Sequence, residues 1–142
     1  MKRRVLFTLS LIVALLFSNS CWSQTGTYKD GVYKGKSRSI YTDEPFWGKV
    51  TLTIRNGKIA KVDFIVIDST KNEVFNEKYE KHYEGNKNYI QQCRNDWNGI
   101  QVYPTILVEK QKLDEVDAIS GATWSYNLLN AAIEDALKGA KK

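Results

Sequence analysis

The fold is decided by the stretch Val50-Thr51-Leu52-Thr53-Ile54-Arg55-Asn56-Gly57-Lys58-Ile59. Apolar residues at the even positions alternate with threonines at the odd positions, which is the period of a half-buried strand. Asn56-Gly57 supplies the two positive-φ positions of a type I′ turn, after which the chain returns from Lys58 to Ile67. The stretch therefore predicts a β-hairpin.

The return strand of this hairpin changes parity. Ile59 stands at an odd position, whereas Val62, Phe64 and Val66 stand at even ones. Successive side chains of a strand point to opposite faces, so one extra residue near Ala60-Lys61 would keep all four apolar side chains on the core face. We therefore predict a β-bulge at that point.

Another strand is expected before the hairpin. Asp30-Gly31 is a turn signal, Val32 and Tyr33 begin an extended piece, and Gly35 and Lys36 end it. After the hairpin, Ile90, Cys93 and Trp97 are spaced for one face of a short helix that Asn98-Gly99 would end. Pro104 can open a second short helix that runs to Gln111, since proline is tolerated in a first turn.

The clearest helix lies at the C-terminal end. Its apolar residues recur with the spacing of an amphipathic helix: Leu128, Leu129, Ala132, Ile133, Ala136 and Leu137. Ser120 falls where an N-cap residue belongs, and the small residues Gly121 and Ala122 let another group approach the backbone. Thr123 puts a hydroxyl in the first turn, where the free N–H groups and the helix dipole favour an anion. The same pattern is also that of an ordinary Ser-capped helix.

These elements predict the fold class. We expect a single α+β domain with a small antiparallel sheet built on the central hairpin. Two or three helices complete it, and the last one starts at Ser120-Gly121-Ala122-Thr123.

The N-terminal segment 1–23 reads as a secretory signal. Three basic residues at positions 2–4 precede an apolar run from Val5 to Phe17, which is shorter than the ~20 residues that a spanning helix needs. Cleavage after Ser20 would leave Cys21 for a lipid anchor, whereas cleavage after Ser23 would release a protein that begins at Gln24. Both remain open, and in either case we expect an exported protein.

Composition argues against several function classes. Removal of the signal leaves 18 basic against 16 acidic residues, a net charge of +2 in place of +5, which is too little to argue for nucleic acid binding. Cys93 is the only cysteine outside the export region and His82 the only histidine, so no metal site is expected. No phosphate loop, dinucleotide fingerprint or nucleophile–base pair is present, so we expect no catalytic residues.

The run Asp117-x-x-Ser120-Gly121-Ala122-Thr123, with Ser125 two residues later, resembles the flavinylation motif of the FMN-binding domain family. This family includes flavoprotein subunits of the sodium-translocating NADH:quinone oxidoreductase and of the Rnf complex. In the family, the last Thr of the motif carries FMN through a phosphoester that a flavin transferase installs from FAD. The resemblance implies that Thr123 is the attachment point, framed by the other cofactor-binding residues, which are Asp117, Ser120, Gly121, Ala122, Trp124 and Ser125. The hairpin from Gly48 to Val66 is similar to the strand pair of the same family, and the domain would span residues 28–142.

This resemblance implies an electron carrier outside the cytoplasm. Its partners would be the flavin transferase and redox proteins of the envelope, with possible membrane anchoring through Cys21. Trp97 and Tyr103 could flank the isoalloxazine ring, because aromatic side chains serve cores and binding sites alike. Two alternatives stay open: a module that binds FMN or another ligand without a covalent bond, and an envelope protein with no redox role.

Overall fold

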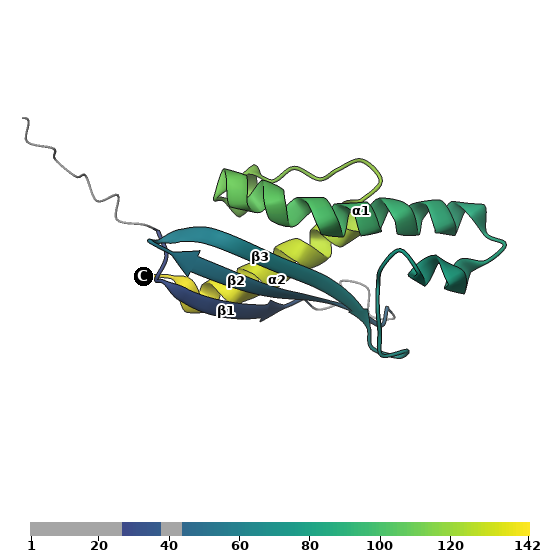
Figure 1. The fold of residues 1–142 in the computed structure, drawn as a ribbon, viewed down its shortest axis with the longest axis horizontal. Coiled ribbons are helices and arrows are strands. Elements are labelled where there is room, and N and C mark those ends of the chain that lie inside the picture. Colours follow the sequence, from purple (N-terminus) through teal and green to yellow (C-terminus); the bar gives the residue numbers. More distant parts are fainter. Residues whose placement is uncertain (1–26, 38–43) are drawn as a thin grey trace, which may run out of the picture.

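The computed structural model describes residues 27–37 and 44–142, which form one antiparallel sheet and two long helices. The sheet has the order β1-β2-β3-β4. Figure 1 shows α1 running along β3 and α2 crossing behind the strands. The elements in chain order are β1 (Gly31–Lys36), β2 (Phe46–Arg55), β3 (Lys58–Asp68), β4 (Glu73–Val74), the 3₁₀ helix η1 (Tyr79–Tyr83), α1 (Lys87–Lys110), the 3₁₀ helix η2 (Leu113–Glu115) and α2 (Thr123–Ala140). The predicted α+β architecture is confirmed.

The expected export signal, including Cys21, lies outside the described residues. Within residues 27–37 and 44–142, no helix has the length and apolar character needed to cross a membrane.

The hairpin of β2 and β3 forms as predicted. Asn56 and Gly57 have φ values of 53° and 69°, the two positive values that a type I′ turn requires. Thr53 pairs with Lys61 but Ile54 pairs with Ile59, so Ala60 is the extra residue of the predicted bulge. The Asp30 carboxylate, just before β1, accepts hydrogen bonds from the Asn56 and Gly57 N–H groups at 2.9 and 2.7 Å. Asp30 therefore fixes the turn between β2 and β3 to the start of β1.

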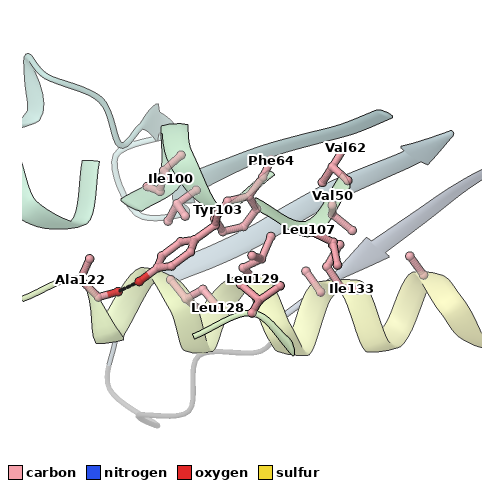
Figure 2. Close-up of a cluster of buried hydrophobic side chains, with 14 of the residues drawn as sticks. Val50, Val62, Phe64, Ile100, Tyr103, Leu107, Ala122, Leu128, Leu129 and Ile133 are labelled. Atoms are coloured by element: carbon pink, nitrogen blue, oxygen red, sulfur yellow. Dashed lines mark hydrogen bonds between the residues drawn. The ribbon is translucent and has the colours of Figure 1, made fainter. Parts of the chain in front are cut away.

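The core lies between the sheet and the helices. Side chains from β2, β3, α1 and α2 interdigitate there (Figure 2), among them Val50, Val62, Phe64, Ile100, Tyr103, Leu107, Leu128, Leu129 and Ile133. The backbone of α2 lies directly against β1 and β2, at two glycines. A Cβ on Gly35 would overlap the Ala132 carbonyl oxygen, and one on Gly48 would lie 3.0 Å from the Leu128 carbonyl oxygen.

The prediction of two short helices between residues 90 and 111 is wrong, because one continuous helix, α1, spans both. Its buried face repeats every three or four residues without a break, at Cys93, Asp96, Ile100, Tyr103 and Leu107. Burial of this face stabilises a continuous helix, which offsets the ~3 kcal/mol that the internal Pro104 costs. The helix does end at Gln111, whose φ is 65°.

Gly99 does not end α1 because it marks the crossing of α1 and α2. A Cβ at this position would lie 2.7 Å from Ser125 Oγ and 2.9 Å from Ala122 Cβ. The glycine that the sequence presents as a helix stop is therefore a contact point between the helices.

Asp68 organises the far end of β3. Its carboxylate is fully buried and accepts hydrogen bonds from the Tyr79 hydroxyl at 2.6 Å, the Thr70 N–H at 2.8 Å and Lys71 Nζ at 2.9 Å. Burial on its own would raise the pKa of Asp68, but the hydrogen bonds together outweigh it and hold the pKa well below its usual range. The charged carboxylate thus joins β3 to η1.

This depressed pKa predicts how stability depends on pH. The contribution of Asp68 to the free energy of unfolding is fully present above the ordinary aspartate pKa of ~3.9 and is lost as pH falls toward the lower native pKa. We expect Asp68→Asn to be less stable than wild type at neutral pH, with a smaller drop in melting temperature between about pH 5 and pH 2. Melting temperatures across this range test the expectation, with the exposed Asp114→Asn as control. Parallel pH profiles of wild type and Asp68→Asn would contradict it.

Candidate functional site

Residues 117–125 form a tight turn that leads into α2. The Ala122 N–H donates to the Ile119 carbonyl at 2.9 Å, and Gly121 has a φ of 80°, which favours glycine. Tyr103 holds both ends of this turn from the core: its hydroxyl donates to the Ala122 carbonyl at 3.0 Å (Figure 2) and accepts from the Ile119 N–H at 2.9 Å. The turn is thereby fixed to α1.

The expectation that Ser120 caps α2 is wrong. The helix begins at Thr123, with Ala122 at the N-cap position and no side-chain hydrogen bond from it. Ser120 lies two residues earlier and is exposed. The left-handed turn at Gly121 moves the helix start past the serine.

Asp96 of α1 supplies the missing cap from another helix. Its Oδ1 accepts from the Ser125 N–H at 3.1 Å and from Ser125 Oγ at 3.0 Å. Gln92 Nε2 donates both to Asp96 Oδ2 at 2.6 Å and to the Gly121 carbonyl at 2.7 Å. Burial raises the pKa of Asp96, although the hydrogen bonds from Gln92 and Ser125 act in the opposite direction. Ser125, predicted to contact a cofactor, is itself fully buried, and its hydroxyl is engaged by Asp96 and by the Ala122 carbonyl.

Thr123 remains open to solvent at the start of α2. Its side chain is exposed, and within the described part of the chain the N–H groups of Thr123 and Trp124 have no acceptor. Unpaired N–H groups at a helix N-terminus, together with the helix dipole, favour an anion. An exposed hydroxyl and a helix start that favours an anion therefore lie together at Thr123. Asp117, six residues earlier, is also exposed.

A pocket of about 200 Å³ adjoins this point, and Trp124 forms part of its wall. The Trp124 ring packs against Phe46 and Phe75, and its Nε1 donates to Glu44 Oε2 at 2.9 Å. The pocket is lined by aromatic and a few polar residues: Glu44, Phe46, Phe75, Tyr83, Tyr89, Gln92, Cys93, Asp96 and Trp124. Burial raises the pKa of the Cys93 thiol to about 11, so this side chain is a neutral thiol at neutral pH. Such a pocket suits a flat aromatic group beside an anion.

The aromatic side chains of this pocket differ from those that the sequence indicated. Tyr103 is fully buried in the core, and Trp97 is half-buried and does not line the pocket. Tyr83 and Tyr89 line it instead, with ring centroids 5.3 Å apart and planes 17° from parallel. Tyr83 is the last residue of η1 and Tyr89 lies in the first turn of α1, in a polar part of the sequence where no apolar periodicity distinguishes them. Metal-ligating side chains form no cluster in residues 27–37 and 44–142.

The Asp96 cap predicts a local loss of stability on mutation. In Asp96→Ala the buried Ser125 N–H would lose its acceptor, which we expect to cost ~1–3 kcal/mol of unfolding free energy. Urea unfolding measures the cost, and faster amide exchange at Ser125 locates it. The exposed Asp114→Ala should change stability by less than ~0.5 kcal/mol. Equal effects of the two substitutions would show that Asp96 does not hold α2.

Comparisons with known proteins identify the family and the fold. The family model described as FMN-binding domain matches residues 44–138, more than half of the chain. The crystal structure of the CPE2226 protein from Clostridium perfringens is 23% identical, covers 80% of this chain and 88% of its own, and superposes with a TM-score of 0.61, which shows a common fold. The solution structure of a protein from Clostridium thermocellum is 22% identical over 76% of this chain and 92% of its own, with a TM-score of 0.41. No curated protein matches this chain at a significant level. Because the FMN-binding domain model matches residues 44–138, more than half of the chain, the chain belongs to the FMN-binding domain family.

Proposed function

We propose that this protein carries FMN covalently on Thr123 and passes electrons between proteins outside the cytoplasm. The observation that carries the proposal is the exposed Thr123 hydroxyl in the first turn of α2, beside the N–H groups of Thr123 and Trp124. In the proposed transfer from FAD, a bond forms between Thr123 Oγ1 and phosphorus as the pyrophosphate bond breaks. AMP leaves, and the hydroxyl proton is released.

The described residues fit FMN in two places. The unpaired N–H groups at the start of α2 suit its phosphate, and the aromatic pocket beside Trp124 suits its ring. The pocket, at about 200 Å³, is smaller than the ~300–1,000 Å³ of common ligand sites. Part of the flavin would therefore stay at the surface, which suits exchange of electrons with partner proteins. When bound, the flavin supplies the redox chemistry, and the protein supplies position and electrostatics.

The place of action follows from the sequence of residues 1–23. An export signal would bring the domain to a flavin transferase outside the cytoplasm, and a lipid on Cys21 would retain it at the membrane. A covalent tether suits such a protein, because a cofactor that dissociates outside the cell is lost.

Co-expression with a flavin transferase tests the proposal. We expect the exported protein to gain the mass of one FMN less one water, to stay fluorescent on a denaturing gel, and to yield a flavin-bearing peptide that contains Thr123. Colour that is lost on denaturation would instead support the non-covalent alternative. A protein without flavin under these conditions would remove the redox role.

A further inference from the structure

The sheet has a second face, turned away from α1 and α2 (Figure 1), and the exposed side chains of this face are mostly basic. Alternation along the strands places the apolar residues under the helices and their neighbours on the open side. The open side carries six exposed basic residues, Lys34, Lys36, Lys49, Arg55, Lys58 and Lys61, which we name the cationic sheet face. Asp63 is the one acidic residue of β1 to β3 on this side, and it pairs with Lys61 at 2.7 Å. Without the three basic residues of the expected signal the net charge is only +2, yet six exposed cations lie together on this one surface.

Like charges face one another across this surface. Lys36 lies opposite Lys49 in the register of β1 and β2, and Arg55 lies opposite Lys58 across the hairpin turn. Like charges directly opposite in a sheet are destabilising, so an anionic surface that neutralises them would be bound more readily. Within residues 27–37 and 44–142, Lys34, Lys36 and Lys49 make no ion pair.

Exposed apolar side chains lie among these cations. Val32, Trp47 and Ile65 are 63%, 37% and 43% exposed, and each stands on the same side of the sheet as the lysines. A shallow hollow of about 290 Å³ lies at the centre, with Lys34, Lys36, Lys49 and Ile65 among its lining residues. Lysines around a tryptophan and aliphatic side chains are typical of surfaces that lie at a lipid headgroup layer.

We propose that the cationic sheet face binds an anionic membrane surface through lipid headgroups. Lysines outnumber arginine five to one among its cations, and protein interfaces are depleted in lysine, whereas basic membrane-binding surfaces need only point charges near the headgroups. A second copy of this face is excluded as occupant by its like charge. The proposal is independent of the flavin, which would sit on the helix side of the sheet and so face away from the membrane.

Vesicle binding by the full-length chain tests this proposal. We expect a component of binding that ~1 M salt removes. This component should be present with vesicles of phosphatidylglycerol and phosphatidylcholine and absent with vesicles of phosphatidylcholine alone. The triple variant Lys34→Gln, Lys36→Gln, Lys49→Gln should weaken this component roughly 100-fold, because each lysine near the headgroups contributes about fivefold in affinity. The matched control, Lys78→Gln, Lys87→Gln and Lys110→Gln combined, removes three exposed cations elsewhere and should change it far less. Binding through residues 1–26 would be common to all variants and would not depend on these lysines.

Two further measurements, of fluorescence quenching and of melting temperature, complete the test. Lipids brominated on the acyl chain should quench the fluorescence of the protein, and Trp47→Phe should remove most of this quenching. The triple variant of the face should melt no lower than wild type, because it relieves the Lys36–Lys49 repulsion. Equal losses in both triple variants, binding that ignores the vesicle charge, or salt-sensitive binding to DNA without binding to vesicles would each overturn the proposal.

Discussion

Thr123→Ala is expected to carry no covalent flavin, while the domain stays folded. The substitution removes the exposed hydroxyl at the first position of α2 and nothing else that the fold uses, since the turn before it is held by Tyr103 and Asp96. Alanine is also the better helix former, so the free energy of unfolding should change by less than ~0.5 kcal/mol. Intact-mass spectrometry after co-expression with a flavin transferase measures the loss, and circular dichroism confirms the fold.

Matched variants make this test specific. Thr105→Ala removes another exposed threonine from a helix and should retain the flavin. Thr123→Ser keeps a hydroxyl at the same position and should still accept it. If Thr123→Ala gains the mass of FMN less water, the attachment point lies elsewhere, and the proposed role of α2 is lost with it.

Gly35→Ala is expected to destabilise the domain by ~3 kcal/mol or more, a large share of the ~5–15 kcal/mol of a typical domain. The new Cβ would overlap the Ala132 carbonyl oxygen and lie 2.5 Å from Ala136 N. Both atoms belong to the backbone of α2, so no side-chain rotation can relieve the clash. Either β1 or α2 must shift, and both pack against the same core. Urea unfolding measures the effect as a lower midpoint.

Gly139→Ala is the matched control for this substitution. Its new Cβ would meet only the Tyr33 ring, at 3.3 Å, and the position lies in α2, where alanine is favoured over glycine by up to ~1 kcal/mol. This variant should be as stable as wild type or more so. Similar midpoints for Gly35→Ala and Gly139→Ala would show that the close approach of β1 and α2 does not limit stability.

The fold could be predicted where the signal is local. The hairpin depends on an Asn-Gly turn and on the alternation of apolar and polar residues along β2. The bulge at Ala60 follows from the change between odd and even apolar positions within β3. Both were predicted correctly. The continuity of α1 was missed because Gly99 and Pro104 read as helix boundaries. What overrides them is tertiary: Gly99 lies against α2, and burial of the face that includes Ile100 and Tyr103 favours one helix.

The candidate site shows the same division. The sequence motif predicted that Thr123 lies in the first turn of a helix, and α2 does begin at this residue. The resemblance predicted the family, which the match over residues 44–138 confirms. The partners that shape the site could not be read from the sequence. Asp96 is 29 residues away from Ser125, from whose N–H it accepts a hydrogen bond. Tyr83 and Tyr89 stand in a polar part of the sequence where the apolar residues follow no regular spacing. The roles of Asp96, Tyr83 and Tyr89 depend on contacts between segments that are far apart in the sequence, so no local sequence pattern predicts them.

The Asp96 cap sets an order of events for this protein. Because Asp96 of α1 accepts a hydrogen bond from the Ser125 N–H in the first turn of α2, the geometry around Thr123 depends on the docking of the two helices. In the proposed function, a chain that is still unfolded after export would offer the motif as a flexible peptide, without the two aligned N–H groups. If the transferase requires the docked form, attachment becomes a checkpoint that only completed domains pass, and the yellow fraction of the protein would report how much of it has matured.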